Sequence, residues 1–190
     1  KLSDYDALVI YGDLSYKDQA DYKAMILMGK KGREFDFIHV LCRQTSRHGV
    51  AVWLYDLWEQ KKLSEQNLKI KIEGLFAQDE FVSDFDAEGD ERGYHIPVIA
   101  DKRGKANKYD RIESTESFFE RRWIFFNDKE KENTDQITLI DQYLAFEKGS
   151  GVNDDGPDCG HGCIDELNRM LFVQKFTPRT TRRVMSNTRY

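Results

Sequence analysis

Close to its start the chain carries the run Ala7-Leu8-Val9-Ile10-Tyr11-Gly12, which is followed directly by Asp13. An uninterrupted apolar run of this length predicts a buried strand over residues 5–12. Gly12 has no side chain, so another part of the protein can approach the backbone there. We therefore expect Asp13 to lie just past the end of a buried strand.

Two further strands are expected soon afterwards, over residues 22–29 and 35–41. The segment Lys30-Lys31-Gly32-Arg33 between them is typical of a tight turn. Short links of this kind join antiparallel neighbours, so the first three strands predict an antiparallel meander.

The pattern then changes to helices that alternate with strands. Helices are expected over residues 49–62, 78–87, 108–122, 137–148 and 164–171, with a loop at 88–93, and strands over 68–73, 96–99 and 123–126. Crossovers of this kind add parallel strands and are normally right-handed. The expected fold is an α/β mixed sheet, in which parallel strands continue the meander and helices cover both faces.

The totals fit one domain of ordinary composition. The chain has 190 residues, of which 39% are hydrophobic and 33% charged. No apolar run approaches the roughly 18 residues of a membrane span, and we see no signal peptide. Three cysteines give no disulfide framework and suit a reducing cytoplasm. The net charge of −5 argues against a simple electrostatic nucleic-acid binder, but not against an enzyme that gathers acids at a metal site.

We expect one domain over residues 1–173 and a basic C-terminal tail over residues 174–190. The tail contains no acid, and its basic residues are Lys175, Arg179, Arg182, Arg183 and Arg189. An ordinary solvated terminus is the alternative interpretation of this tail. The chain does not begin with Met, which suggests a fragment or a processed chain that other domains could precede.

Acidic residues fall at three separate places that the fold could bring together. Asp154-Asp155-Gly156-Pro157-Asp158 comes just ahead of the helical run 164–171, where carboxylates commonly cap a helix. Asp13 and Glu73, however, each end a predicted strand. If those strands are adjacent and parallel, both acids leave the same sheet edge, and the start of the last helix could bring Asp154, Asp155 or Asp158 to them.

Such a cluster needs cations. Carboxylates within about 5 Å of each other repel by about 3 kcal/mol per pair at an effective dielectric of 20. Two divalent cations would offset this repulsion, and oxygen ligands favour Mg²⁺ or Mn²⁺ over zinc. Two such ions about 3.5–4 Å apart hydrolyse phosphodiesters in many enzymes. Cys159, His161 and Cys163 offer only three ligands with no partner cluster, so a structural zinc site is not favoured.

Five segments together resemble the nuclease domain of tailed-phage terminase large subunits. They are Gly12-Asp13-Leu14-Ser15, Asp21-Tyr22-Lys23-Ala24, Ile72-Glu73-Gly74, Lys108-Tyr109-Asp110-Arg111-Ile112 and Asn153-Asp154-Asp155-Gly156-Pro157-Asp158. The resemblance extends over residues 5–171. Many relatives have His where this chain has Asn153, and Ala-Leu where it has Cys159-Gly160, which leaves the start of the last helix open.

The resemblance implies an RNase H-like fold and metal-dependent cutting of concatemeric viral DNA during genome packaging. It implies that Asp13 and Glu73 bind metal and that Asp155 is the third catalytic acid. Asp154 and Asp158 would be further ligands or supporting acids. Among the basic residues between positions 102 and 111, Lys105, Lys108 and Arg111 are candidates for DNA phosphate contacts, with a solvated loop and helix start as the alternative.

The implied partners are double-stranded DNA, the portal protein, the small terminase subunit and an upstream ATPase domain, in the cytoplasm of a bacterial host. The chain contains no Gly-x-x-x-x-Gly-Lys-Ser/Thr loop, so we expect no ATPase motor within it. A Holliday-junction resolvase or another RNase H-like nuclease would share the acids. A non-catalytic phage interaction domain, in which the acids only cap helices and strand ends, is the alternative of a different class.

Overall fold

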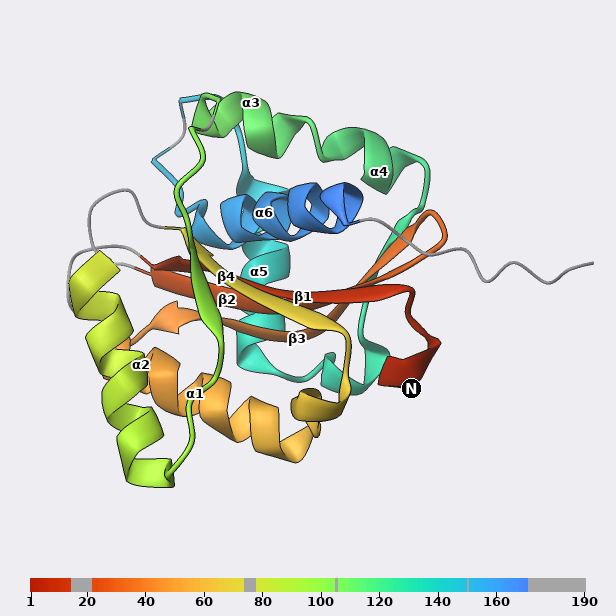
Figure 1. Ribbon diagram of the computed structural model, residues 1–190. Coiled ribbons are helices and arrows are strands. Elements are labelled where there is room, and N and C mark those ends of the chain that lie inside the picture. Colours follow the sequence, from red (N-terminus) through yellow and green to blue (C-terminus); the bar gives the residue numbers. More distant parts are fainter. Residues whose placement is uncertain (15–21, 74–77, 105, 150, 171–190) are drawn as a thin grey trace, which may run out of the picture.

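The protein is a six-stranded mixed sheet with helices on both faces, as the computed structural model shows (Figure 1). The structure describes residues 1–14, 22–73, 78–104, 106–149 and 151–170. The strands are β1 (Ala7–Leu14), β2 (Tyr22–Lys31), β3 (Glu34–Gln44), β4 (Leu68–Glu73), β5 (Val98–Asp101) and β6 (Ile124–Phe126). The helices are α1 (Arg47–Gln60), α2 (Gln78–Arg92), α3 (Lys108–Glu113), α4 (Glu116–Glu120), α5 (Thr134–Ala145) and α6 (Asp155–Arg169). Short 3₁₀ turns lie at Leu2–Asp4, Leu63–Glu65 and Asp128–Glu130.

The strand order β5-β4-β1-β2-β3-β6 confirms the predicted topology. β1, β2 and β3 form the antiparallel meander, and β4, β5 and β6 join it as parallel strands. Gly12 of β1 pairs with Ile72 of β4, so Asp13 and Glu73 leave the same edge of the sheet. None of the helices in the described ranges is long and apolar enough to cross a membrane.

The strand β1 is apolar on both sides because the sheet is covered on both faces. Leu8 and Ile10 belong to the core beneath α1, whereas Val9 and Tyr11 belong to the core beneath α6. Figure 1 shows α1 and α2 on one face of the sheet and α6 on the other, with α3 and α4 beyond α6. Side chains alternate along a strand, so Asp13 follows Val9 and Tyr11 onto the α6 face.

Several predicted helices differ in extent from those in the structure. The loop predicted at 88–93 is wrong, because α2 continues to Arg92. Arg92 binds carboxylates of α1 and of its own helix, at Asp56, Glu59 and Glu88, and these contacts hold the last turn of α2. The single helix predicted over 108–122 is broken at Ser114-Thr115. The Thr115 hydroxyl donates to the Ile112 carbonyl there, an alternative to a continued helical ladder.

The last helix begins at Asp155, about nine residues ahead of the helical run predicted over 164–171, so the acidic stretch forms its first turn. Its glycines permit close packing that any larger residue would prevent. A Cβ at Gly160 would overlap the hydroxyl of Tyr143, and a Cβ at Gly162 would overlap the ring of Tyr11. The burial of this face against the sheet outweighs the poor helix propensity of glycine.

We expect Gly162→Ala to lower the free energy of unfolding by about 1–2 kcal/mol. Alanine gains up to about 1 kcal/mol in helix propensity, but overpacking typically costs about 1–3 kcal/mol. The Tyr11 ring is fully buried and its hydroxyl donates to Asp101, so it cannot move aside cheaply. Urea denaturation of Gly162→Ala beside Gly151→Ala, where a Cβ would meet nothing within 4 Å, measures the effect. Equal or higher stability of Gly162→Ala would contradict this packing.

Candidate metal centre

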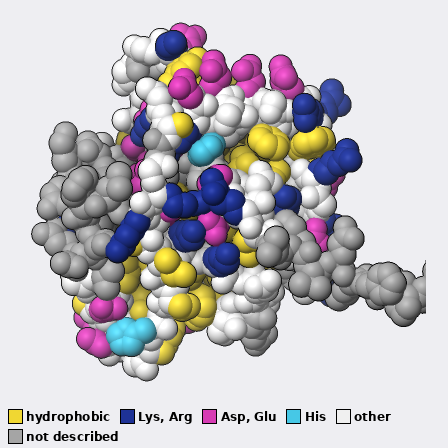
Figure 2. All heavy atoms as spheres, turned by 45° about the horizontal axis from the view of Figure 1, so that its top comes forward, with side chains coloured by type: hydrophobic (Ala, Val, Ile, Leu, Met, Phe, Trp, Pro, Cys, Tyr) yellow, Lys and Arg dark blue, Asp and Glu magenta, His cyan; other side chains and the backbone are white. Residues whose placement is uncertain are grey.

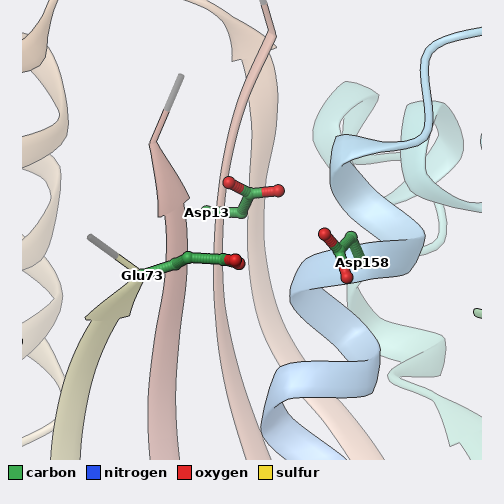
Figure 3. A group of neighbouring side chains, drawn as sticks. All are labelled: Asp13, Glu73 and Asp158. Carbon is green, nitrogen blue, oxygen red and sulfur yellow. The ribbon is translucent and has the colours of Figure 1, made fainter. Parts of the chain in front are cut away.

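Three carboxylates from distant parts of the chain meet at one edge of the sheet (Figure 3). Asp13 lies near the end of β1, Glu73 ends β4, and Asp158 lies in the first turn of α6. One oxygen from each carboxylate lies within 4.8 Å of the other two. The parallel register of β1 and β4 supplies two of the acids, and the close packing of α6 on β1 supplies the third.

The surroundings of Asp13 disfavour its negative charge. Burial is the largest cause, and the carboxylates of Glu73 and Asp158 add repulsion, so that the pKa of Asp13 is raised to about 8. Asp158 is only 2% exposed. A cation bound between these oxygens would favour the ionised form of Asp13.

Two basic residues of α3 contact the acids. Arg111 donates from Nη2 to Oδ2 of Asp158 at 2.9 Å, and its Nη1 lies 3.8 Å from Oε1 of Glu73. Lys108 Nζ lies 2.7 Å from Oδ1 of Asp154 and 3.3 Å from Oδ1 of Asp155. Burial opposes the charge of Lys108, but the hydrogen bond to Asp154 and the nearby acids raise the pKa of Lys108 above its ordinary value.

The structure thus sorts the predicted site residues into groups. Asp13, Glu73 and Asp158 converge, whereas Asp154 and Asp155 lie beside them in contact with Lys108. The catalytic role expected of Asp155 and the DNA contacts expected of the basic residues stay predictions. The predicted DNA contact Lys105 and the tail over residues 174–190 lie outside the described residues.

Sequence reasoning missed Asp101, the acid that ends β5. Asp101 is opposite Glu73 in the strand register and is 2% exposed. Burial disfavours its charge, but Arg103 and the Tyr11 hydroxyl donate to it and hold the pKa of Asp101 well below its usual range. Its signal was the same as that of Glu73, an acid at the end of a short strand. Asp101 anchors Arg103 beside the cluster.

Further basic side chains lie on the α6 side of the sheet. Lys69, Lys71 and Arg103 surround the buried carboxylate of Glu166. Figure 2, which turns the α3 side of the molecule forward, shows lysine and arginine side chains gathered near the middle of this face around a few acids. A hollow of about 190 Å³ opens beside the cluster, and its lining includes Tyr11, Arg103, Arg111, His161 and Arg169.

The donor set fits a hard divalent cation. Three carboxylate oxygens within 4.8 Å of one another are the ligands that Mg²⁺ and Mn²⁺ prefer. The neighbouring cysteines do not extend this set. The Cys159 thiol donates to the carbonyl of Tyr11, and Cys163 lies against the carbonyl of Ile26, both in the buried core of the protein. Among the described residues, the three acids form the metal-competent group.

The sheet order, the helices on both faces and the acids at the strand ends define an RNase H-like α/β domain. Among solved structures, the nuclease domain of the human cytomegalovirus terminase superposes with a TM-score of 0.62 at 15% identity, covering 85% of this chain and 84% of that one. The g2p nuclease domain of bacteriophage SPP1, with bound Mn, gives 0.55 at 14% identity over 87% and 89% of the two chains.

A third similar structure is the large terminase of the thermophilic bacteriophage D6E, with a TM-score of 0.56 at 16% identity. That match covers 86% of this chain but only 40% of the D6E protein. No protein-family model matches the sequence, and no curated protein does so. The chain therefore has the fold of terminase nuclease domains, a likeness that lies in structure far more than in sequence.

Proposed function

We propose that this domain is a divalent-metal-dependent DNA endonuclease, equivalent to the nuclease domain of a terminase large subunit. The observation that carries the proposal is the convergence of Asp13, Glu73 and Asp158 at one edge of a sheet with the fold of those domains. The Mn bound in the SPP1 nuclease domain supports a divalent cation as the cofactor.

The chain's own residues would bind the cation and orient the DNA. Asp13, Glu73 and Asp158 would hold Mg²⁺ or Mn²⁺, which when bound polarises a phosphate and lowers the pKa of a water molecule. Arg111 holds two of these carboxylates in place. Its Nε is buried and has no hydrogen-bond partner within the described ranges.

The biological setting follows from the same proposal. A terminase nuclease would cut double-stranded viral DNA during packaging, with an ATPase domain, the portal protein and the small subunit as partners. For a phage protein, that setting is the cytoplasm of the bacterial host. The lysines and arginines around the cluster would face the phosphates of the duplex (Figure 2).

We expect the protein to cut supercoiled plasmid in Mg²⁺ or Mn²⁺ and to leave it intact in chelator. Glu73→Gln keeps the shape of the side chain but removes a ligand charge, so we expect cutting to fall by at least about 100-fold. Agarose gels of plasmid conversion over time measure the rate. The matched control is Glu91→Gln, which changes an exposed acid of α2 and should cut like the wild type.

Several results would contradict the proposal in different ways. Undiminished cutting by Glu73→Gln would show that the acidic cluster takes no part in the cleavage reaction. Cutting confined to branched DNA would favour a Holliday-junction resolvase. Intact plasmid in every condition, together with a melting temperature that Mn²⁺ does not change, would favour a non-catalytic interaction domain.

A further inference from the structure

We infer that Lys108 supplies the second positive charge of this centre, so that the site binds one divalent cation and not the two expected from the sequence. The inference rests on the proposed metal-dependent function and concerns how that site is occupied. Two-ion centres need carboxylates that serve a second ion. In this protein the acids available for that purpose, Asp154 and Asp155, already contact an ammonium group.

The position of Lys108 supports this role. Its Nζ lies 2.7 Å from Asp154 and 3.3 Å from Asp155, and it lies 4.0 Å from Oδ2 of Asp158. Asp158 also belongs to the triad with Asp13 and Glu73. The ammonium group therefore lies directly beside the predicted metal position and shares one of its ligands.

The fold also fixes the lysine in place. Lys108 is the first residue of α3, where the side chain of Asn107 accepts from the backbone N–H of Tyr109 at 2.8 Å and caps the helix. Arg111 follows one turn later and reaches the same cluster. Both basic residues thus project from one short, capped helix toward the acids, unlike the mobile side chain of a solvent-exposed lysine.

The charges around the cluster limit where a second cation could bind. The cluster contains five carboxylates, from Asp13, Glu73, Asp154, Asp155 and Asp158, whereas α3 contributes only Lys108 and Arg111. One divalent cation would leave this group with a small negative formal charge and two would leave an equally small positive one, so the position of the ammonium group decides between the two cases. A second cation would have to share the Asp154 and Asp155 oxygens with a charged amine, and like charges at that distance repel. The ammonium group can neutralise a phosphate, although it cannot activate water as a metal does.

The test is the number of Mn²⁺ ions that the whole chain binds, measured by isothermal titration calorimetry. We expect one ion per wild-type chain and two per Lys108→Met chain, because the substitution releases Asp154 and Asp155. Lys108→Arg keeps the charge and should bind one ion. Lys102→Met, which removes an exposed lysine of the same connecting segment, should also bind one.

The number of bound ions tests the inference without any measurement of DNA cleavage. Two ions in the wild-type chain, or one ion in a folded Lys108→Met chain, would overturn the inference and leave the proposed nuclease standing. Absence of Mn²⁺ binding in the wild type would remove the proposed function as well. Electron paramagnetic resonance of the Mn²⁺-loaded wild type needs no variant: an isolated-ion spectrum supports the inference, and a spin-coupled pair refutes it.

Discussion

Asp13→Asn should abolish metal-dependent cleavage and yet, in chelator at pH 8, unfold less easily than the wild type. Asparagine keeps the size of the side chain but removes a charge that the fold disfavours. Loss of a direct metal ligand should lower the cleavage rate by at least about 100-fold. A substitution that stabilises the protein while inactivating it is the behaviour expected of a site in which function requires clustered like charges.

The pH dependence of the stability gain has a definite sign. The carboxyl of Asp13 has a pKa of about 8 in the folded protein, against 3.8 as its ordinary value. Between these values the folded chain keeps a proton that the unfolded chain has released, so wild-type stability falls as the pH rises. The slope reaches about 1.4 kcal/mol per pH unit for one group. The difference between variant and wild type should therefore be small near pH 4 and largest near pH 8.

Urea denaturation in chelator at pH 5, 6.5 and 8 measures this difference. Asp141→Asn, which removes an exposed acid of α5, controls for the general effect of one charge and should show a nearly constant difference. If Asp13→Asn is less stable than the wild type at pH 8, or still cuts DNA, Asp13 is not a strained member of a metal-binding cluster.

The part of the site that could be predicted from sequence lies on the strands. β1 is an apolar run and β4 alternates apolar residues with lysines, and each has one acid at or next to its end, Asp13 or Glu73. The crossover through α1 makes β4 parallel to β3 and therefore to β1, whereas the adjacency of β1 and β4 was a condition that only the structure could meet. Asp101 ends β5 in the same way and was open to the same reasoning, but its strand is so short and so close to Pro97 that its end was placed too early.

Which acid of α6 joins the triad could not be predicted, because the residues that make this segment a helix act through tertiary contacts. Gly156, Gly160 and Gly162 favour a loop by propensity, and each is required where the helix meets Leu139, Tyr143 or Tyr11. As long as the residue at which the helix begins is unknown, the sequence does not indicate which side of the helix each acid faces. Nothing in the local sequence therefore shows that Asp158 joins the triad while Asp154 and Asp155 contact Lys108.

Arg111→Met should be the most destabilising of these substitutions in chelator, and Mn²⁺ should partly reverse the loss. The Arg111 side chain is about 10% exposed and spans Asp158 and Glu73. Methionine fills much of the same volume but leaves buried carboxylates without their cation, a change that typically costs about 3–5 kcal/mol. A bound divalent cation contacts the same carboxylates, so it can replace part of the lost charge. Thermal melts in chelator and in Mn²⁺ measure both effects.

The control is Arg169→Met, which removes an arginine that pairs with Asp165 one helical turn away and is 61% exposed. Such a surface pair contributes less than about 1 kcal/mol. Asp165 keeps its contact with Arg103 in this variant, so it does not become an unpaired carboxylate that Mn²⁺ would stabilise. The increase in melting temperature on adding Mn²⁺ should therefore be larger for Arg111→Met than for either Arg169→Met or the wild type. Equal increases in all three proteins would show that the guanidinium of Arg111 and the metal do not act on the same carboxylates. Mn²⁺ can replace the guanidinium of Arg111 only if both bind the same carboxylates. Equal increases would therefore mean that Arg111 stabilises α6 through packing.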